Sequence, residues 1–71
     1  MSNVTKIKID TDFIKLDSLL KLGGIASTGG QAKQIIQSEQ IKLNGEVCTQ
    51  RGKKIKKGDT VSFSDEVIEV T

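Results

Sequence analysis

Residues 27–45 contain the strongest local folding signals of this chain. Ala32, Ile35 and Ile36 are spaced as one apolar stripe of a short helix. Ser27 or Thr28 can cap the start of this helix by accepting a hydrogen bond from a free backbone N–H. The other side chains of the helix are polar and face elsewhere, namely Gln31, Lys33, Gln34 and Gln37.

The dipeptide Asn44-Gly45 strongly indicates a β-hairpin, because a type I′ turn needs positive φ at both central residues. Residues 41–43 and 46–49 are the expected strands on either side of the turn. In this hairpin we expect Lys42 to point outward and Val47 to point inward.

The rest of the chain adds a strand, a helix and further strands. Leu16, Leu19 and Leu20 are spaced i, i+3, i+4, which predicts a helix that ends with Gly23 as a left-handed cap. We expect Phe13 and Ile14 to cover the core. Alternating polar and apolar residues predict strands over residues 5–10 and 60–64, and residues 67–70 are the expected last strand of the sheet. This order predicts an α+β fold with two short helices packed on a small bent antiparallel sheet, in one domain over residues 1–71.

The net charge of +2 hides an uneven distribution of charge. Residues 31–58 carry seven basic and two acidic side chains, whereas residues 59–71 carry four acidic side chains and no basic one. A clustered basic segment is typical of proteins that bind polyanions. The alternative is an ordinary solvated, lysine-rich surface.

The residue types argue against catalysis. The chain has no histidine and one cysteine, so it has no internal disulfide and no usual nucleophilic dyad. No metal-ligand cluster or paired carboxylates are visible, and Asp17 and Asp59 are interpreted as turn residues. We therefore expect no enzymatic activity, no metal, no cofactor and no small-molecule substrate. Without a long apolar run, we expect no membrane partner and a cytoplasmic location.

Gly29 and Gly30 stand in the first turn of the second predicted helix, where glycine has poor helix propensity. They either form a tight opening turn or allow close approach of another backbone, such as a phosphate chain, to the helix start. The sequence leaves both readings open.

Several motif blocks resemble the S4 RNA-binding domain, in the same order and at similar spacing. The blocks are Lys15-Leu16-Asp17 followed by Leu19-Leu20-Lys21, Gln31-Ala32-Lys33 with Ile36, Ile41-Lys42-Leu43-Asn44-Gly45, and Ile55 with Gly58-Asp59 and Val61. Among S4 proteins, the chain is most similar to the small free-standing bacterial group known as YaaA/YbcJ-like proteins. The resemblance implies an αL-type fold that presents a basic groove to structured RNA. We expect the ligand to be ribosomal RNA or ribosome-associated RNA, and the protein to be a monomer.

Residues at matching positions become candidate RNA contacts. One departure is that the arginine that many S4 domains carry after the serine of the second helix is absent here. The phosphate contact would then pass to backbone N–H groups, Lys33 and Arg51. The full set of candidate contacts is Lys15, Ser27, Thr28, Gly30, Gln31, Lys33, Gln34, Lys42, Arg51, Lys53, Lys54 and Lys57.

Two other functions fit the same residues. One is a protein–protein adaptor or β-grasp-like module, although a sulfur carrier would need a C-terminal Gly-Gly and this chain ends Glu69-Val70-Thr71. The other is binding of duplex DNA through the same basic face. Stacking on single-stranded RNA is disfavoured, because Phe13 and Phe63 are the only aromatic residues and we expect both to be buried.

Overall fold

The computed structural model describes residues 3–71. Its main sheet has five strands in the order β1-β7-β6-β3-β4. Residues 1 and 2 of the expected domain lie outside the described range. The strands are β1 (Asn3–Ile7), β3 (Ile41–Leu43), β4 (Glu46–Val47), β6 (Thr60–Phe63) and β7 (Glu66–Val70).

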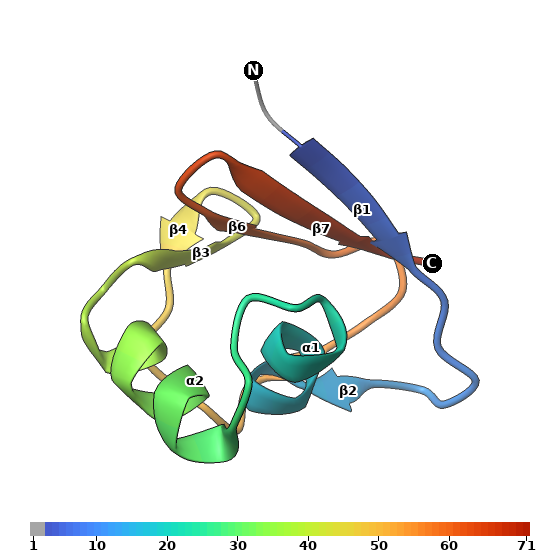
Figure 1. Ribbon diagram of the computed structural model, residues 1–71. Coiled ribbons are helices and arrows are strands. Elements are labelled where there is room, and N and C mark those ends of the chain that lie inside the picture. Colours follow the sequence, from blue (N-terminus) through green and yellow to red (C-terminus); the bar gives the residue numbers. More distant parts are fainter. Residues whose placement is uncertain (1–2) are drawn as a thin grey trace.

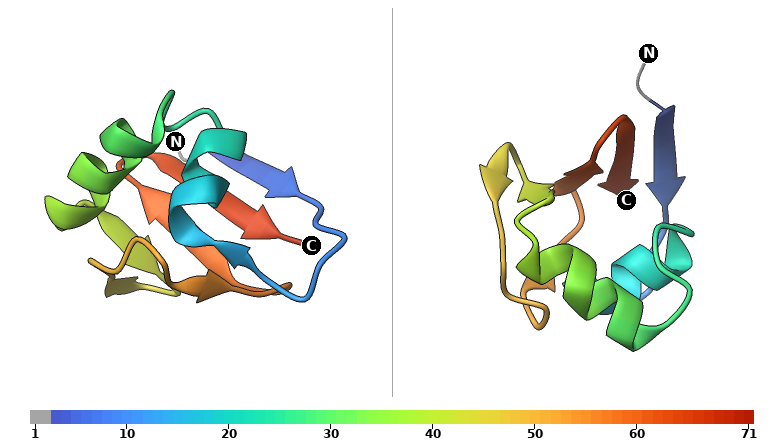
Figure 2. Two further views of the ribbon diagram at one scale, coloured as in Figure 1. Left: turned by 90° about the horizontal axis from the view of Figure 1, so that it is seen from below. Right: turned by 60° about the vertical axis from the view of Figure 1, so that its left-hand side comes forward.

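Two helices, α1 (Leu16–Leu22) and α2 (Gly29–Gln37), cover one face of this sheet (Figures 1 and 2). A second, two-stranded sheet of β2 (Ile14–Lys15) and β5 (Lys54–Ile55) leads into α1. The predicted leucine stripe of α1 is confirmed, because Leu16, Leu19 and Leu20 are all 0% exposed. The other large side chains that are completely or almost completely buried are Ile36, Ile41, Ile55, Val61, Ile68 and Val70.

The predicted α+β class, with two short helices on a small sheet, is confirmed. Strands β7, β6, β3 and β4 pair antiparallel, whereas β1 pairs in parallel with β7. The sheet is therefore mixed, a detail that the expectation of an antiparallel sheet missed. β1 lies at the sheet edge with Lys6 exposed, and charged side chains on an edge strand hinder pairing with other molecules.

The predicted hairpin is confirmed, but one of its side chains points the other way. Asn44 and Gly45 have φ of 51° and 90°, as a type I′ turn requires. The register pairs Val47 with Lys42, whose neighbours Ile41 and Leu43 face the core. Val47 therefore lies on the face away from the helices and is 50% exposed, so the expectation that it points inward is wrong.

The end of α1 also differs from the prediction. Gly23 has φ −79°, and the left-handed residue is Gly24, with φ 77°. Gly23 is needed for space instead, because a Cβ at this position would collide with the side chain of Ile68 in β7. The missing side chain of Gly23 thus lets the end of α1 approach the sheet closely.

Phe13 lies at the surface rather than over the core. Its side chain is 37% exposed, so the expectation that it is buried is wrong, whereas Ile14 does pack against the core. The Nζ atom of Lys54 lies 4.9 Å from the centroid of the Phe13 ring, which is a cation–π contact. This contact places an aromatic ring beside exposed basic side chains.

Asp59 links the hairpin turn to the loop before β6. Its Oδ2 accepts a hydrogen bond from the Lys56 N–H at 2.8 Å, and its Oδ1 accepts one from Asn44 Nδ2 at 3.1 Å. The Lys56 N–H contributes most to lowering the pKa of Asp59, and Asn44 and the charges of Lys56 and Lys53 act in the same direction. Asn44 Oδ1 in turn accepts from the Thr60 N–H at 2.9 Å.

We expect the Asp59→Asn variant to lose a pH-dependent part of the stability. The pKa of Asp59 is lower in the folded than in the unfolded chain, so its carboxylate stabilises the fold at neutral pH. This contribution disappears as the pH falls through the folded-state pKa. Urea unfolding midpoints from about pH 6 to about pH 2 should therefore converge for wild type and variant at the acidic end. Parallel profiles would contradict this role.

Candidate nucleic-acid interface

Two lysines lie opposite each other in the small sheet. The register pairs Lys15 of β2 with Lys54 of β5, and pairs Ile14 with Ile55, which is fully buried. The face that carries Lys15 and Lys54 is therefore exposed. Within residues 3–71 neither ammonium has a carboxylate within ion-pair distance, and like charges directly opposite each other are destabilising. A bound anion would relieve this repulsion.

Arg51 is anchored to the start of α1. Its carbonyl oxygen accepts a hydrogen bond from the Asp17 N–H at 3.1 Å, and the Lys53 carbonyl accepts one from the Leu16 N–H at 2.9 Å. The Arg51 Nε and Nη2 also donate to Asp17 Oδ2 at 3.4 and 3.3 Å. A Cβ on Gly29 would lie 3.8 Å from the same Nη2, so the guanidinium stands between the starts of the two helices.

The start of α2 is capped by its own side chains. Thr28 is the cap, and its Oγ1 accepts from the Gln31 N–H at 3.1 Å. The Gln31 Oε1 accepts in return from the Ser27 N–H at 2.7 Å. Of the two candidate caps, Thr28 is therefore the one used, and the oxygen of Gln31 is occupied within the fold.

Nothing inside the fold requires glycine at positions 29 and 30. Neither residue has positive φ. A Cβ would make only ordinary contact at Gly29 and would meet nothing within 4 Å at Gly30. No hydrogen bond from the N–H of either residue to another group occurs among residues 3–71. Internal packing therefore does not explain why glycine occupies these two positions. The N–H groups of Gly29 and Gly30 are left free to donate to a ligand.

The structure brings most of the candidate contacts to one region. Lys15, Arg51, Lys53 and Lys54, which we call the basic surface, are connected through β2, β5 and the start of α1. Gly29 joins this surface to α2, and Lys33 and Gln34 are exposed on the same helix. Lys57 is exposed beyond β5, next to Gly58, whose N–H donates to the Val70 carbonyl at 2.7 Å.

Lys42 does not join the basic surface. It is exposed and pairs with Val47 and Ser62, on the face of the sheet away from the helices. The alternation of a β-strand explains this, because Ile41 and Leu43 on either side of it face the core. An RNA lying along the helix face would therefore not reach Lys42 directly.

Two residues at this interface were not expected there from the sequence. Asp17 holds the Arg51 side chain, although the two are 34 residues apart in the chain. Phe13 lies under Lys54. No short-range pattern signals either contact, because both depend on how β5 and its preceding loop pack against β2 and α1.

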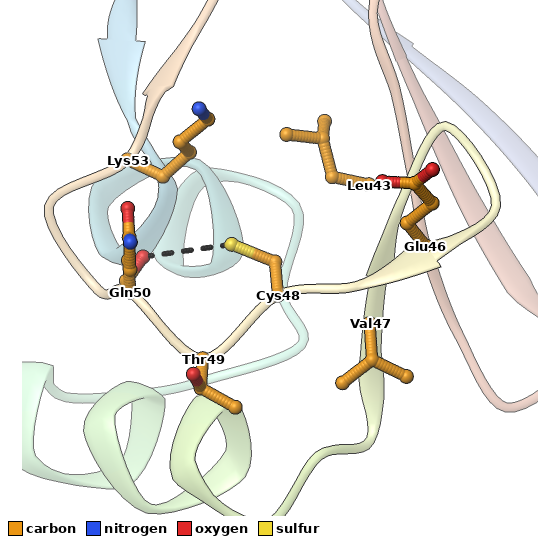
Figure 3. A pocket seen from close by; sticks show the side chains of 7 residues that line it. All are labelled: Leu43, Glu46, Val47, Cys48, Thr49, Gln50 and Lys53. Carbon is orange, nitrogen blue, oxygen red and sulfur yellow. Dashed lines mark hydrogen bonds between the residues drawn. The ribbon is translucent and has the colours of Figure 1, made fainter.

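A pocket of about 260 Å³ adjoins the interface (Figure 3). Its thiol, Cys48 Sγ, is half-buried and donates to the Gln50 carbonyl at 3.9 Å. In Figure 3 Val47 lies on the other side of β4 from Leu43 and Glu46. Lys53 is the one basic residue that lines the pocket, so the pocket borders the basic surface and adds no further cation to it. It is lined by Leu43, Glu46, Val47, Cys48, Thr49, Gln50 and Lys53.

The described part of the chain contains neither a candidate metal site nor a membrane-spanning helix. Across residues 3–71, no three His, Cys, Asp or Glu side chains gather where they could hold a metal ion. No helix in the same range is long and apolar enough to span a lipid bilayer.

Two bacterial proteins are similar in sequence to most of this chain. A protein of Bacillus subtilis (strain 168), named probable ribosome maturation protein RlbA, is 38% identical over 57 residues, which cover 80% of this chain and 80% of that protein. A protein of Escherichia coli (strain K12), named putative RNA-binding protein YbcJ, is 42% identical over 57 residues, which cover 80% of this chain and 81% of that protein.

Solved structures and a family model also match this chain. The solution structure of E. coli YbcJ, described as revealing an αL motif involved in RNA binding, has a TM-score of 0.74 and 38% identity, and covers 100% of this chain and 91% of that one. A pseudouridylate synthase crystal structure has a TM-score of 0.71 and 27% identity over 79% of this chain, but only 24% of the synthase is matched. The model of the S4 domain matches residues 7–71, so the chain belongs to the S4 domain family.

Proposed function

We propose that this protein binds structured RNA through the basic surface and the start of α2, and that it catalyses no reaction. The observation that carries the proposal is the pair Lys15 and Lys54, two lysines held opposite each other with no carboxylate partner among residues 3–71. Arg51 and Lys53 lie next to this pair, in the loop directly before β5. Such a cluster of cations favours a ligand that carries several closely spaced negative charges.

The chemistry of the surface suits a folded RNA. Double-stranded RNA is recognised mainly by its shape, its phosphates and its 2′-hydroxyl groups. The basic surface can contact phosphates, and the free N–H groups of Gly29 and Gly30 can donate to phosphate oxygens. Gln34 on the exposed side of α2 can reach sugar hydroxyls or base edges.

The relatives support a narrower proposal about the target. One relative is named a probable ribosome maturation protein and another a putative RNA-binding protein, so we propose ribosomal RNA as the ligand. The likeness to a pseudouridylate synthase covers 24% of that enzyme, so its activity does not carry over. We propose that residues 1–71 act as one domain, as a monomer, in the cytoplasm.

Crosslinking in living cells tests the ligand directly. The protein would be crosslinked to nucleic acid with ultraviolet light and purified under denaturing conditions, and the attached fragments would be sequenced. We expect ribosomal RNA to be enriched over its level with a Lys54→Glu variant. Recovery of no RNA above the level of that variant, or recovery of DNA instead, would contradict the proposal.

A Gly30→Ala variant separates the two readings of the Gly29-Gly30 pair. The new methyl group meets nothing in the fold, so we expect alanine to stabilise the protein by about 0.4–1 kcal/mol. If an RNA backbone approaches the helix start closely, the same variant binds RNA more weakly. Urea unfolding and a binding titration measure the two effects. A more stable variant with unchanged RNA affinity would show that Gly30 serves only the opening turn.

A further inference from the structure

We propose that Asp17 is a positioning residue for RNA binding, which holds the guanidinium of Arg51 in place to receive a phosphate. This inference rests on the proposed function. It concerns an acidic residue, whose charge by itself opposes RNA binding. The proposal is that its effect through Arg51 outweighs that repulsion.

The arrangement of the two side chains supports a positioning role. The Asp17 side chain is 17% exposed and the Arg51 side chain is 48% exposed, so the carboxylate lies behind the guanidinium rather than in front of it. Asp17 Oδ1 accepts from the Ser18 N–H at 2.8 Å, which fixes the carboxylate at the start of α1. A phosphate that approaches from solvent would therefore meet Arg51 before it meets Asp17.

Arg51 keeps most of its hydrogen-bonding capacity in this position. A guanidinium has five N–H donors. Only Nε and Nη2 donate to Asp17, both to the single oxygen Oδ2, at 3.4 and 3.3 Å. These distances are longer than the roughly 2.7–2.9 Å of a tight charge-assisted hydrogen bond. The ion pair thus orients the guanidinium and leaves donors for a phosphate.

The backbone restrains the same residue. The Asp17 N–H donates to the Arg51 carbonyl at 3.1 Å, so both the main chain and the side chain of Arg51 are fastened to α1. The guanidinium is thereby held beside Gly29 at the start of α2. A long side chain that is already ordered loses less conformational entropy when it binds its ligand.

An Asp17→Asn variant gives the sharpest test, because charge alone and positioning predict opposite results. The asparagine oxygen can still accept from the Ser18 N–H, so the start of α1 is kept. We expect the RNA affinity to fall by about three- to tenfold, although the protein gains a positive unit of net charge. Asp12→Asn is the matched control, since it removes an exposed carboxylate that forms no ion pair among residues 3–71, and should leave affinity equal or higher.

The double variant Asp17→Asn/Arg51→Ala shows whether Asp17 acts through Arg51. Fluorescence anisotropy against one ribosomal RNA fragment, in rising KCl, would be measured for wild type, both single variants and the double variant. We expect Arg51→Ala to reduce the steepness of the salt dependence of RNA binding by about 1. We expect Asp17→Asn to reduce the steepness in the same direction. We also expect Asp17→Asn to cause no further loss of affinity once Arg51 is absent. Unfolding midpoints confirm that each variant is folded.

Two results would overturn the proposal. One is an Asp17→Asn variant that binds RNA as tightly as wild type or more tightly. The other is an equal loss from Asp17→Asn with and without Arg51. A failure of the proposed function looks different, because then wild type and the Lys54→Glu variant would bind the fragment equally weakly, and this would overturn both proposals together.

Discussion

Replacing Leu20 by alanine is expected to destabilise the protein by about 2–5 kcal/mol. Leu20 is 0% exposed in the centre of the core, so its truncation leaves a cavity under α1. A chain of this length has a total stability of roughly 4–11 kcal/mol. The loss is therefore a large fraction of the total stability, and the unfolding midpoint should fall well below that of the wild type, as measured by circular dichroism during urea or thermal unfolding.

Leu22→Ala is the matched control for this prediction. It makes the same chemical change in the same helix, but Leu22 is 65% exposed. We expect its effect to remain within about 0.5 kcal/mol. Equal losses of stability from the two variants would show that the core does not lie between α1 and the sheet as described.

The Lys54→Glu variant is expected to lose about 10- to 100-fold in RNA affinity while the fold remains stable. The loss corresponds to one or more charge-assisted contacts of about 1.5–3 kcal/mol each. The fold is spared because the introduced carboxylate would lie opposite Lys15, and a cross-strand pair of opposite charges is favourable by about 0.2–1 kcal/mol. The lost cation–π contact with Phe13 is of similar size. Anisotropy titrations and unfolding curves measure the two quantities separately.

Lys42→Glu provides the control for charge alone. It makes the same change of net charge on the far face of the sheet, where Lys42 pairs with Val47 and Ser62. We expect a much smaller loss of RNA affinity than for Lys54→Glu. Similar losses from both variants would mean that RNA binding follows the net charge rather than the basic surface.

The parts of the fold that could be predicted are those with short-range patterns. The leucine spacing in residues 16–20 determines the buried side of α1. Asn44-Gly45 determines the turn between β3 and β4, because both residues have positive φ. The direction of Val47 could not be predicted in this way. It depends on the partner that β4 meets, and the register with Lys42 turns it away from the core.

The candidate site shows the same division. The basic residues and the capped start of α2 were visible in the sequence, because charge and capping residues are local features. The pairing of Lys15 with Lys54 was not visible in the sequence, since β2 and β5 have two residues each and show no alternation. The contact between Asp17 and Arg51 joins positions 34 residues apart and arises only when the loop before β5 folds back on α1.

The most direct test of the central claim is the salt dependence of RNA binding by the wild-type protein. If the four residues of the basic surface each neutralise a phosphate, the logarithm of the association constant should fall with the logarithm of KCl concentration with a slope of about −3 to −4. Lys54→Glu should reduce this slope by about 1. A flat response, or a slope that Lys54→Glu leaves unchanged, would contradict binding of RNA phosphates by this surface.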